Sequence, residues 1–346
     1  MEMPYRRLGS AGIKMSVFSL GSWVTFANQV DRQGGIECMA AARAAGVNFF
    51  DNAEAYSAGR SETLMGEALA ELGWPRHSYL VSTKFFWGIH QGPNTRNTLN
   101  RKYLLEAVDQ SLERLGLDHV DLYQIHGWDP NAPMEEGLRA LEDIVRSGRA
   151  RYVGVSNWAA WQIAKALGIQ ERNGWDKYVS LQAFYAVSGR DLEREIVPML
   201  TSEGLGLMVW SPLAGGLLSG KYERDAEGQV AGEGRRAKLD FPRVDKAASF
   251  DAVDAMRPMA EARGVSVTAI ALAWLLHRPV VSSVIVGAKR ADQLEQNLAA
   301  SGIELTSEEL AALEPIGALE PEYPAWAIEA QDARHGFRIS PRRPKA

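Results

Sequence analysis

Residues 48–56 read NFFDNAEAY, an apolar run that ends abruptly in an acid, with a phenol a few residues later. The run up to Phe50 is typical of the end of a buried strand, and the residues after Asp51 are typical of the loop that leaves it. Catalytic groups often lie in such loops because a rigid strand positions them. We therefore expect Asp51 and Tyr56 to lie at a functional site.

The rest of the chain alternates short apolar runs with amphipathic or alanine-rich segments. The predicted strands span residues 17–20, 47–50, 79–84, 120–125, 152–155, 179–183, 205–210 and 281–286, and the predicted helices span 37–45, 61–69, 100–115, 134–145, 158–167, 192–200, 253–262, 267–276 and 291–298. Eight strand-then-helix units with continuous apolar strands predict an α/β fold, a (β/α)8 TIM barrel. A doubly wound sheet would alternate in the same way, but no G-x-G-x-x-G motif opens a helix after the first strand.

We expect one barrel domain over residues 1–319, with three additions to the minimal barrel. A hairpin around residues 9–12 precedes the first strand, and a long, glycine-bearing and charged segment follows the seventh strand as far as about Phe241. Residues 320–346 form a C-terminal tail with several prolines and a basic end. Three interpretations of the tail stay open: a disordered arm, a pocket-lining arm and an oligomer contact.

Composition excludes several classes of function. The 346 residues carry a formal net charge of -5, without the basic stripe that phosphate backbones require, so no nucleic-acid partner is expected. A lone cysteine, Cys38, allows no intrachain disulfide, which fits a reducing compartment. The N-terminus lacks the apolar core of a signal peptide, and the most apolar later run, residues 267–276, is too short to span a bilayer. These features predict a cytoplasmic protein without a membrane segment.

Side chains with useful chemistry follow most of the predicted strands. In a barrel the C-terminal ends of the strands meet at one mouth, so residues far apart in sequence face each other there. Singly, an acid at such a place is usually a helix cap, a lysine a solvated charge and a histidine a structural hydrogen-bonding group. Asp51, Lys84 and His126 at three successive strand ends, with Tyr56 just beyond the first, form a set that caps and solvation do not explain.

These residues lie in longer motifs through which the chain resembles the aldo-keto reductases, most closely the branch of the voltage-gated potassium channel beta subunits and their bacterial relatives. The motifs are NFFDNAEAY at 48–56, STK at 82–84, SLERLG at 111–116, VDLYQIH at 120–126, GVSN at 154–157 and WSPLAGG at 210–216. GSWVTF at 21–26 and GAKR at 287–290 indicate the same branch. The resemblance covers most of the chain and is specific, because its motifs are spread around the whole barrel.

The resemblance implies a reversible hydride transfer between NADPH and an aldehyde or ketone, carried out by a tetrad of Asp51, Tyr56, Lys84 and His126. Hydride addition places negative charge on the carbonyl oxygen, so a proton donor must stand beside it, and Tyr56 takes that role. A phenol has a reference pKa of about 10, which the Lys84 ammonium would lower while Asp51 anchors Lys84. His126 would hydrogen-bond the substrate oxygen, and no metal is required.

The resemblance also implies a site for NADP(H). Ser156, Asn157 and Gln182 would hold the nicotinamide carboxamide, and Trp210 would stack on the ring. Lys289 or Arg290 would pair with the 2'-phosphate, which favours NADP over NAD. The residues assigned to the cofactor are Ser22, Trp23, Gln29, Asp51, Ser156, Asn157, Gln182, Trp210, Ser211, Pro212, Leu213, Ala214, Gly215, Lys221, Arg236, Gly287, Lys289, Gln293, Gln296 and Asn297.

Three tryptophans suggest the nature of the substrate. Trp23, Trp87 and Trp128 follow the first, third and fourth strands, where aromatic side chains either wall a pocket or serve as ordinary packing. As pocket walls they predict a small carbonyl substrate with an apolar or aromatic part, rather than a charged sugar phosphate.

A regulatory or redox-sensing subunit that binds NADPH, with incidental catalysis, is the alternative function. The channel-subunit branch carries asparagine where this chain has His126 and arginine where it has Asn157, so this chain has the residues of the ordinary enzymes and we expect an active reductase. The branch also implies a homo-oligomer.

Two other functions find less support. Residues 215–221 read GGLLSGK, which resembles a phosphate-binding loop, but Tyr222 stands where serine or threonine must ligate magnesium, and we discard an ATPase. A glycosidase needs two carboxylates across a sugar cleft, whereas Lys84 would neutralise Asp51 and Glu54 lies in the same loop.

Overall fold

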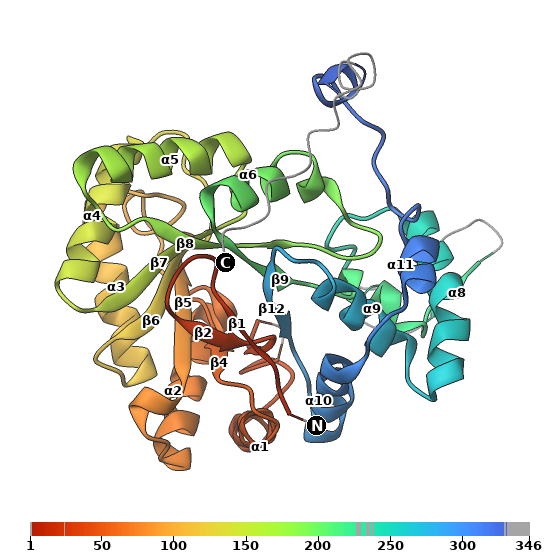
Figure 1. Ribbon diagram of the computed structural model, residues 1–346. Coiled ribbons are helices and arrows are strands. Elements are labelled where there is room, and N and C mark those ends of the chain that lie inside the picture. The colour runs from red at the N-terminus through yellow and green to blue at the C-terminus, as the bar shows by residue number, and fades with distance from the viewer. Residues whose placement is uncertain are drawn as a thin grey trace.

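The computed structural model describes residues 2–23, 25–225, 230–232, 236, 239–328 and 330. Eight parallel strands close into a barrel with helices around it (Figure 1). Their order around the barrel is β12 (Val281–Val286), β3 (Phe18–Gly21), β4 (Phe49–Asp51), β5 (Leu80–Phe85), β6 (Val120–Ile125), β7 (Ala150–Ser156), β8 (Tyr178–Phe184) and β9 (Gly206–Trp210). The predicted (β/α)8 barrel is confirmed.

Apart from their ends, the helices on the outside agree with the predicted segments, except for the last, which was not predicted. They are α1 (Arg32–Ala44), α2 (Arg60–Leu72), α3 (Arg101–Leu115), α4 (Met134–Arg146), α5 (Ala160–Asn173), α6 (Ile196–Glu203), α8 (Lys246–Arg263), α9 (Val267–Leu276), α10 (Ala291–Leu298) and α11 (Ser307–Leu313). Asn100 caps α3, since its side chain accepts a hydrogen bond from the Tyr103 N–H at 2.9 Å. Helix α8 begins well before residue 253, because the Asp245 side chain caps it through the Ala248 N–H.

The predicted N-terminal hairpin is confirmed and closes one end of the barrel. Strands β1 (Tyr5–Arg7) and β2 (Lys14–Ser16) pair antiparallel. Gly9 has a φ of +60°, and a Cβ there would lie 2.4 Å from the carbonyl oxygen of Gly204, so only glycine lets the hairpin turn approach the start of β9 this closely. Because the hairpin covers the N-terminal ends of the strands, the C-terminal ends stay open for a site.

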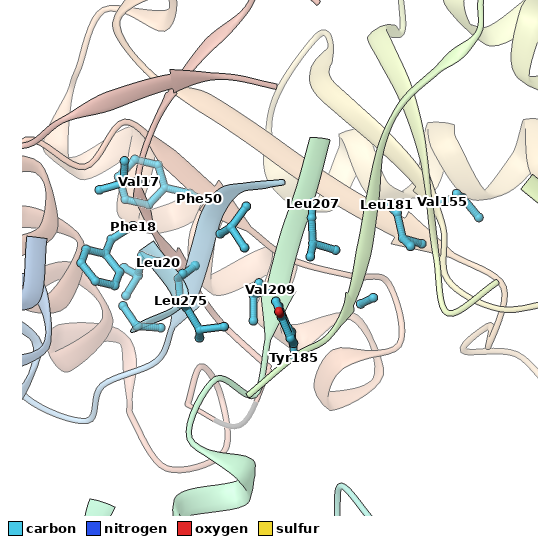
Figure 2. Packing of buried hydrophobic residues seen from close by; sticks show 14 of the residues in the cluster. Val17, Phe18, Leu20, Phe50, Val155, Leu181, Tyr185, Leu207, Val209 and Leu275 are labelled. Atoms are coloured by element: carbon cyan, nitrogen blue, oxygen red, sulfur yellow. The ribbon is translucent and has the colours of Figure 1, made fainter. Parts of the chain in front are cut away.

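Two hydrophobic clusters show which way the strand residues point. A smaller cluster joins Phe49, Leu122 and Met208 of three strands with two hairpin residues, and so fills the barrel interior. The larger cluster lies between the strands and the helices and contains Phe50 and Leu207, two of the side chains in Figure 2. Successive side chains of a strand alternate between faces, so Asp51 points inward like Phe49. The same alternation turns Lys84, Gln124 and Trp210 toward the interior.

The insertion after the seventh strand is longer than a barrel loop needs. Between β9 and α8 the described residues form the 3-10 segment Ala214–Ser219 and a small hairpin of β10 (Glu223–Arg224) and β11 (Val230–Ala231). At the C-terminus, Tyr323 and Trp326 are exposed. The predicted basic end of the tail, with Arg338, Arg342, Arg343 and Lys345, lies outside the described residues.

Across the described ranges, no single helix is long and apolar enough to cross a membrane. Helices α8 and α9 pass that test only together, as a pair bent by 100°.

Candidate active site

A cleft of about 1530 Å³ opens at the C-terminal ends of the barrel strands. It collects residues from loops that lie far apart in the sequence. Of the residues expected from sequence, those that line it are Trp23, Gln29, Asp51, Tyr56, Trp87, His126, Ser156, Asn157, Gln182, Trp210, Ser211, Pro212, Leu213, Gly215, Lys221, Gly287, Lys289, Gln293 and Asn297. The tertiary structure therefore brings most of the predicted site residues to one place.

An ion pair forms the floor of the cleft. The Lys84 Nζ donates to Asp51 Oδ2 at 2.6 Å and to the Asn52 carbonyl oxygen at 2.8 Å, and its side chain is fully buried. Asp51 Oδ1 accepts hydrogen bonds from Ser82 Oγ at 2.6 Å and from Gln182 Nε2 at 3.0 Å. A buried charge of this kind persists only when it is paired and hydrogen-bonded, and both conditions are met here.

Tyr56 lies next to this pair and is half-buried. The Lys84 Nζ lies 5.1 Å from the centre of the Tyr56 ring. Burial raises the pKa of the Tyr56 phenol well above its usual value, and the Asp51 carboxylate raises it further. Burial and the Asp51 carboxylate therefore outweigh the lowering of this pKa that was expected from Lys84. The phenol keeps its proton at neutral pH.

His126 lies beside Tyr56 at the end of β6, with the two ring centres 5.6 Å apart and the rings nearly perpendicular. Its backbone N–H donates to the Phe85 carbonyl oxygen at 2.9 Å, which holds the residue against β5. Burial lowers the pKa of the His126 imidazole well below its usual value, and the positive charge of Lys84 lowers it further. The imidazole is therefore neutral near pH 7, with one ring nitrogen as donor and the other as acceptor.

Asn157 connects three strand ends around the cleft. Its Nδ2 donates to the His126 carbonyl oxygen at 3.2 Å and to Ser156 Oγ at 3.0 Å, and its Oδ1 accepts from Trp210 Nε1 at 3.1 Å. The backbone of Asn157 has a φ of 60°, a conformation that asparagine tolerates better than most residues. These bonds fix the orientation of the Trp210 indole.

An aromatic group encloses the same part of the cleft. The rings of Trp210 and Phe241 are parallel, at 3° and 5.6 Å between centres, and Trp23 meets Phe241 edge-on at 5.6 Å. Sequence reasoning did not single out Phe241, because an aromatic residue inside a long irregular loop has no periodicity that would mark it. The enclosure depends on how that loop folds back over β9.

Two lysines bring positive charge to the side of the cleft formed by β9 and β12, which are neighbours in the barrel. Lys221 follows β9 and Lys289 follows β12, and both line the cleft. Arg290 instead donates to both carboxylate oxygens of Asp292 at 2.8 Å each. Gly215 has a φ of +69°, and a Cβ there would lie 2.6 Å from the Phe241 carbonyl oxygen, so the loop packs directly on it.

The remaining predicted residues do not line the cleft. Ser22 donates its hydroxyl to the Asp51 carbonyl oxygen at 3.0 Å, and Ala214 is buried in the core. Arg236 is buried and ties its loop together, by donating to the Pro242 carbonyl oxygen at 2.6 Å and pairing with Asp240. Gln296 is exposed on α10.

Trp128 also lies apart from the lining residues. Its ring packs edge-on against Trp158 at 4.7 Å and faces Trp161 at 6.0 Å. The structure thus gives Trp128 a packing role, whereas Trp23 and Trp87 lie at the cleft with 37% and 45% of their surface exposed. Within the part of the chain that the structure describes, no group of three or more His, Cys, Asp or Glu could hold a metal ion.

The sequence is similar to known proteins over most of its length. The sequence model of the Aldo/keto reductase family matches residues 18–318. A probable voltage-gated potassium channel subunit beta of Arabidopsis thaliana is 40% identical over 303 residues, which cover 86% of this chain and 91% of that protein. A protein of the same description from Oryza sativa is 41% identical with the same coverage, and a putative one from Schizosaccharomyces pombe is 38% identical over 309 residues, 86% of this chain and 88% of that protein.

Proposed function

Since the chain belongs to the aldo/keto reductase family, whose members are generally NADPH-dependent oxidoreductases, we propose that it reduces aldehydes or ketones to alcohols with Tyr56 as the proton donor. One observation carries the proposal: a protonated phenol and a neutral imidazole stand side by side in the cleft, directly above a buried ammonium. This arrangement supplies what a carbonyl oxygen needs as it gains negative charge.

The cleft fits NADP(H) in size and in the distribution of charge. Its volume of about 1530 Å³ exceeds the roughly 300–1,000 Å³ of ordinary small-molecule pockets, which leaves room for a dinucleotide and a substrate together. Lys221 and Lys289 would hold phosphate groups, with Lys289 the candidate for the 2'-phosphate. The hydrogen-bonding groups of Ser156, Asn157 and Gln182 would hold the nicotinamide amide, and Trp210 would flank the ring. When bound, NADPH supplies the hydride.

The four residues Asp51, Tyr56, Lys84 and His126 would deliver the proton to the substrate. The Tyr56 hydroxyl donates its proton to the carbonyl oxygen as charge develops there, and the neutral His126 ring donates a hydrogen bond to the same oxygen and orients it. The phenolate left on Tyr56 is stabilised by Lys84, whose ammonium Asp51 holds in place at 2.6 Å. Asp51 therefore acts through Lys84 and does not touch the substrate.

The lining of the cleft supports an uncharged substrate. Besides Tyr56, the acids and bases among its described lining residues are Asp51, His126, Lys221 and Lys289. Lys84 neutralises Asp51, His126 is uncharged near neutral pH, and both lysines lie on the side assigned to the phosphates. What surrounds Tyr56 is aromatic, with Trp23 at 6.4 Å between ring centres and Trp87 beside His126. A small aldehyde or ketone with an apolar or aromatic part suits these surroundings.

A regulatory NADPH-binding subunit is the second candidate function, because the similar proteins named above are described as potassium channel beta subunits. Under this candidate the chain would join a homo-oligomer that contacts a partner protein, and catalysis would be incidental. The cleft and its lysines serve both functions, so the two are distinguished by turnover. A cytoplasmic location remains a prediction for either function.

The decisive experiment measures NADPH consumption, by nicotinamide absorbance, with a panel of aldehydes and ketones. We expect turnover by the wild-type protein and a loss of about 10²- to 10⁴-fold in Tyr56→Phe, the range for a removed general acid. NADPH affinity, measured by cofactor fluorescence, stays within about twofold because the hydroxyl is not assigned to cofactor binding.

Tyr178→Phe is the matched control, since it removes a buried hydroxyl without a hydrogen-bond partner among the described residues, away from the cleft. Bound NADPH with no turnover of any carbonyl compound would favour the regulatory subunit. Full activity of Tyr56→Phe would contradict the assigned proton donor.

A further inference from the structure

The buried carboxylate of Glu54 lies between Asp51 and Tyr56 in sequence and has no part in the chemistry above. Only 2% of the residue is exposed. Its Oε1 accepts hydrogen bonds from the backbone N–H of Phe86 at 2.8 Å and of Gly88 at 3.0 Å, and also from the Tyr103 hydroxyl. The two backbone donors stand on either side of Trp87 in the loop after β5.

The surroundings of Glu54 indicate a strong clamp. Burial raises the pKa of the carboxyl, while the hydrogen bonds from Tyr103, Phe86 and Gly88 act in the opposite direction and favour the charged form. Burial and the nearby Glu54 raise the pKa of the Tyr103 phenol, so Tyr103 keeps its proton and remains a donor. All three donors converge on one oxygen, which limits the movement of the loop.

The clamp holds a strained piece of backbone. Phe86 has a φ of 147°, a region that favours glycine, so its conformation must be imposed by neighbouring groups. The Phe86 ring lies where a Cβ on Gly127 would approach it to 2.5 Å, so the residue after His126 has to be glycine. The positive φ of Phe86 leaves Trp87 at the cleft. The centre of the Trp87 ring lies 4.9 Å from that of Phe86 and 6.2 Å from that of His126.

The main chain of Glu54 links the loop after β4 to strand β5. Its N–H donates to the Lys84 carbonyl oxygen at 3.0 Å, two residues before Phe86. One residue therefore connects the loop that carries Tyr56 with the loop that carries Trp87. A change of the Glu54 side chain keeps this backbone bond and frees the loop of Trp87 alone.

We propose that Glu54 is a positioning residue that fixes Trp87 as a wall of the substrate pocket and so sets a preference for carbonyl compounds with an aromatic group. The inference rests on the proposed function, because it names the substrate class of that site. Glu54 does not touch the substrate and acts only through the loop of Trp87.

Steady-state kinetics with benzaldehyde and propanal test the proposal. Glu54→Gln keeps the shape of the side chain but removes its charge. We expect KM for benzaldehyde to rise about tenfold, equal to about 1.4 kcal/mol, and KM and kcat for propanal to stay within about twofold. Tyr103→Phe removes one of the three donors and should raise KM for benzaldehyde about threefold. It replaces Glu54→Gln as the test if that variant does not fold.

Glu142→Gln is the matched control. Glu142 is also buried and also accepts a backbone hydrogen bond, from Asp176 N–H at 2.8 Å, but it lies on α4 and does not line the cleft. The KM of Glu142→Gln for benzaldehyde should equal that of wild type, even if this variant is less stable. Hydrogen exchange over residues 86–97 should be faster in Glu54→Gln and unchanged in Glu142→Gln.

A double-mutant cycle with Trp87→Ala separates positioning from general loosening. If Glu54 acts through Trp87, Glu54→Gln has no further effect on KM for benzaldehyde once Trp87 is alanine. A full tenfold effect in that background, or equal losses for propanal and benzaldehyde, would overturn the proposal.

If the wild-type protein reduces neither aldehyde, the result counts against the proposed function, and the role of Glu54 is tested by binding. Equilibrium binding of benzaldehyde to the NADP-loaded protein then decides it. Tenfold weaker binding by Glu54→Gln supports the proposal, and unchanged binding refutes it.

Discussion

Replacing Lys84 by methionine should destabilise the protein more than replacing both members of its ion pair. Lys84 is fully buried and Asp51 nearly so, with 2.6 Å between Nζ and Oδ2. Lys84→Met leaves the Asp51 carboxylate inside the barrel without its cation. Removing one partner of such a pair costs about 3–5 kcal/mol. Since Ser82 and Gln182 still donate to Asp51, we expect a cost at the lower end, about 3 kcal/mol.

The double variant Asp51→Asn/Lys84→Met removes both charges and keeps similar volumes. An amide oxygen at position 51 can still accept from Ser82 and Gln182, so the buried polar groups retain partners. Replacing a buried pair by neutral groups is often nearly neutral in free energy, so we expect the double variant to lose about 1 kcal/mol. The double variant should therefore be about 2 kcal/mol more stable than Lys84→Met alone.

Urea unfolding followed by circular dichroism gives the free energies, provided that the three proteins unfold with the same m-value. Lys102→Met is a suitable control because Lys102 pairs with Glu106 on the exposed face of α3, where an ion pair contributes little. Equal losses in the single and double variants would show that Asp51 does not depend on Lys84, and would refute the assignment of Asp51 as the anchor.

Two further predictions follow from the charges around the cleft. Lys289→Met should weaken NADPH binding about tenfold and leave NADH binding within about twofold, because the lysine is assigned to the 2'-phosphate. Fluorescence titrations measure both affinities, and equal losses for the two cofactors would contradict that assignment. Burial holds the pKa of His126 well below its usual value, so the unfolded chain binds the proton more tightly and stability is lost as pH falls below about 6.5. In urea unfolding, His126→Asn should lose less stability than wild type between pH 7.5 and pH 5.5. His77→Asn, at an exposed position, should lose as much as wild type. If His126→Asn also loses as much as wild type, the imidazole is not held neutral.

Clear breaks around apolar runs made parts of the fold predictable to the residue. Strands 120–125 and 281–286 and helices 267–276 and 291–298 have the predicted bounds, since polar or turn-forming residues adjoin both ends of strand 120–125 and of helix 267–276 and one end of each of the other two. The start of α8 was missed, since the residues before its apolar face are alanine-rich and polar and only the Asp245 cap marks the beginning. Helix α5 runs on beyond the predicted end at residue 167 to Asn173, because the chain meets no helix stop before Gly174, which is in the left-handed conformation.

The site was predictable where it depends on strand ends and not where it depends on loop paths. Asp51, Lys84 and His126 could be placed together because parallel strands align their C-terminal ends and inward side chains alternate. Trp128 was expected beside them, but its loop turns it toward Trp158. Phe241 was missed and lies parallel to Trp210, because the long loop after β9 folds back over the cleft.

The barrel, its eight units and the set of groups at its mouth could be predicted because they follow from local patterns and from motifs spread around the whole chain. The protonation states of those groups could not be predicted in this way, because they depend on burial and on neighbours that come together only in the folded chain. Burial and the Asp51 carboxylate raise the pKa of Tyr56 and outweigh the Lys84 ammonium, which is paired with Asp51 beneath the ring, and this balance depends on where the groups lie in space. The link from Glu54 to the loop of Trp87 is of the same kind, since it depends on three donors from two separate elements that meet at one oxygen.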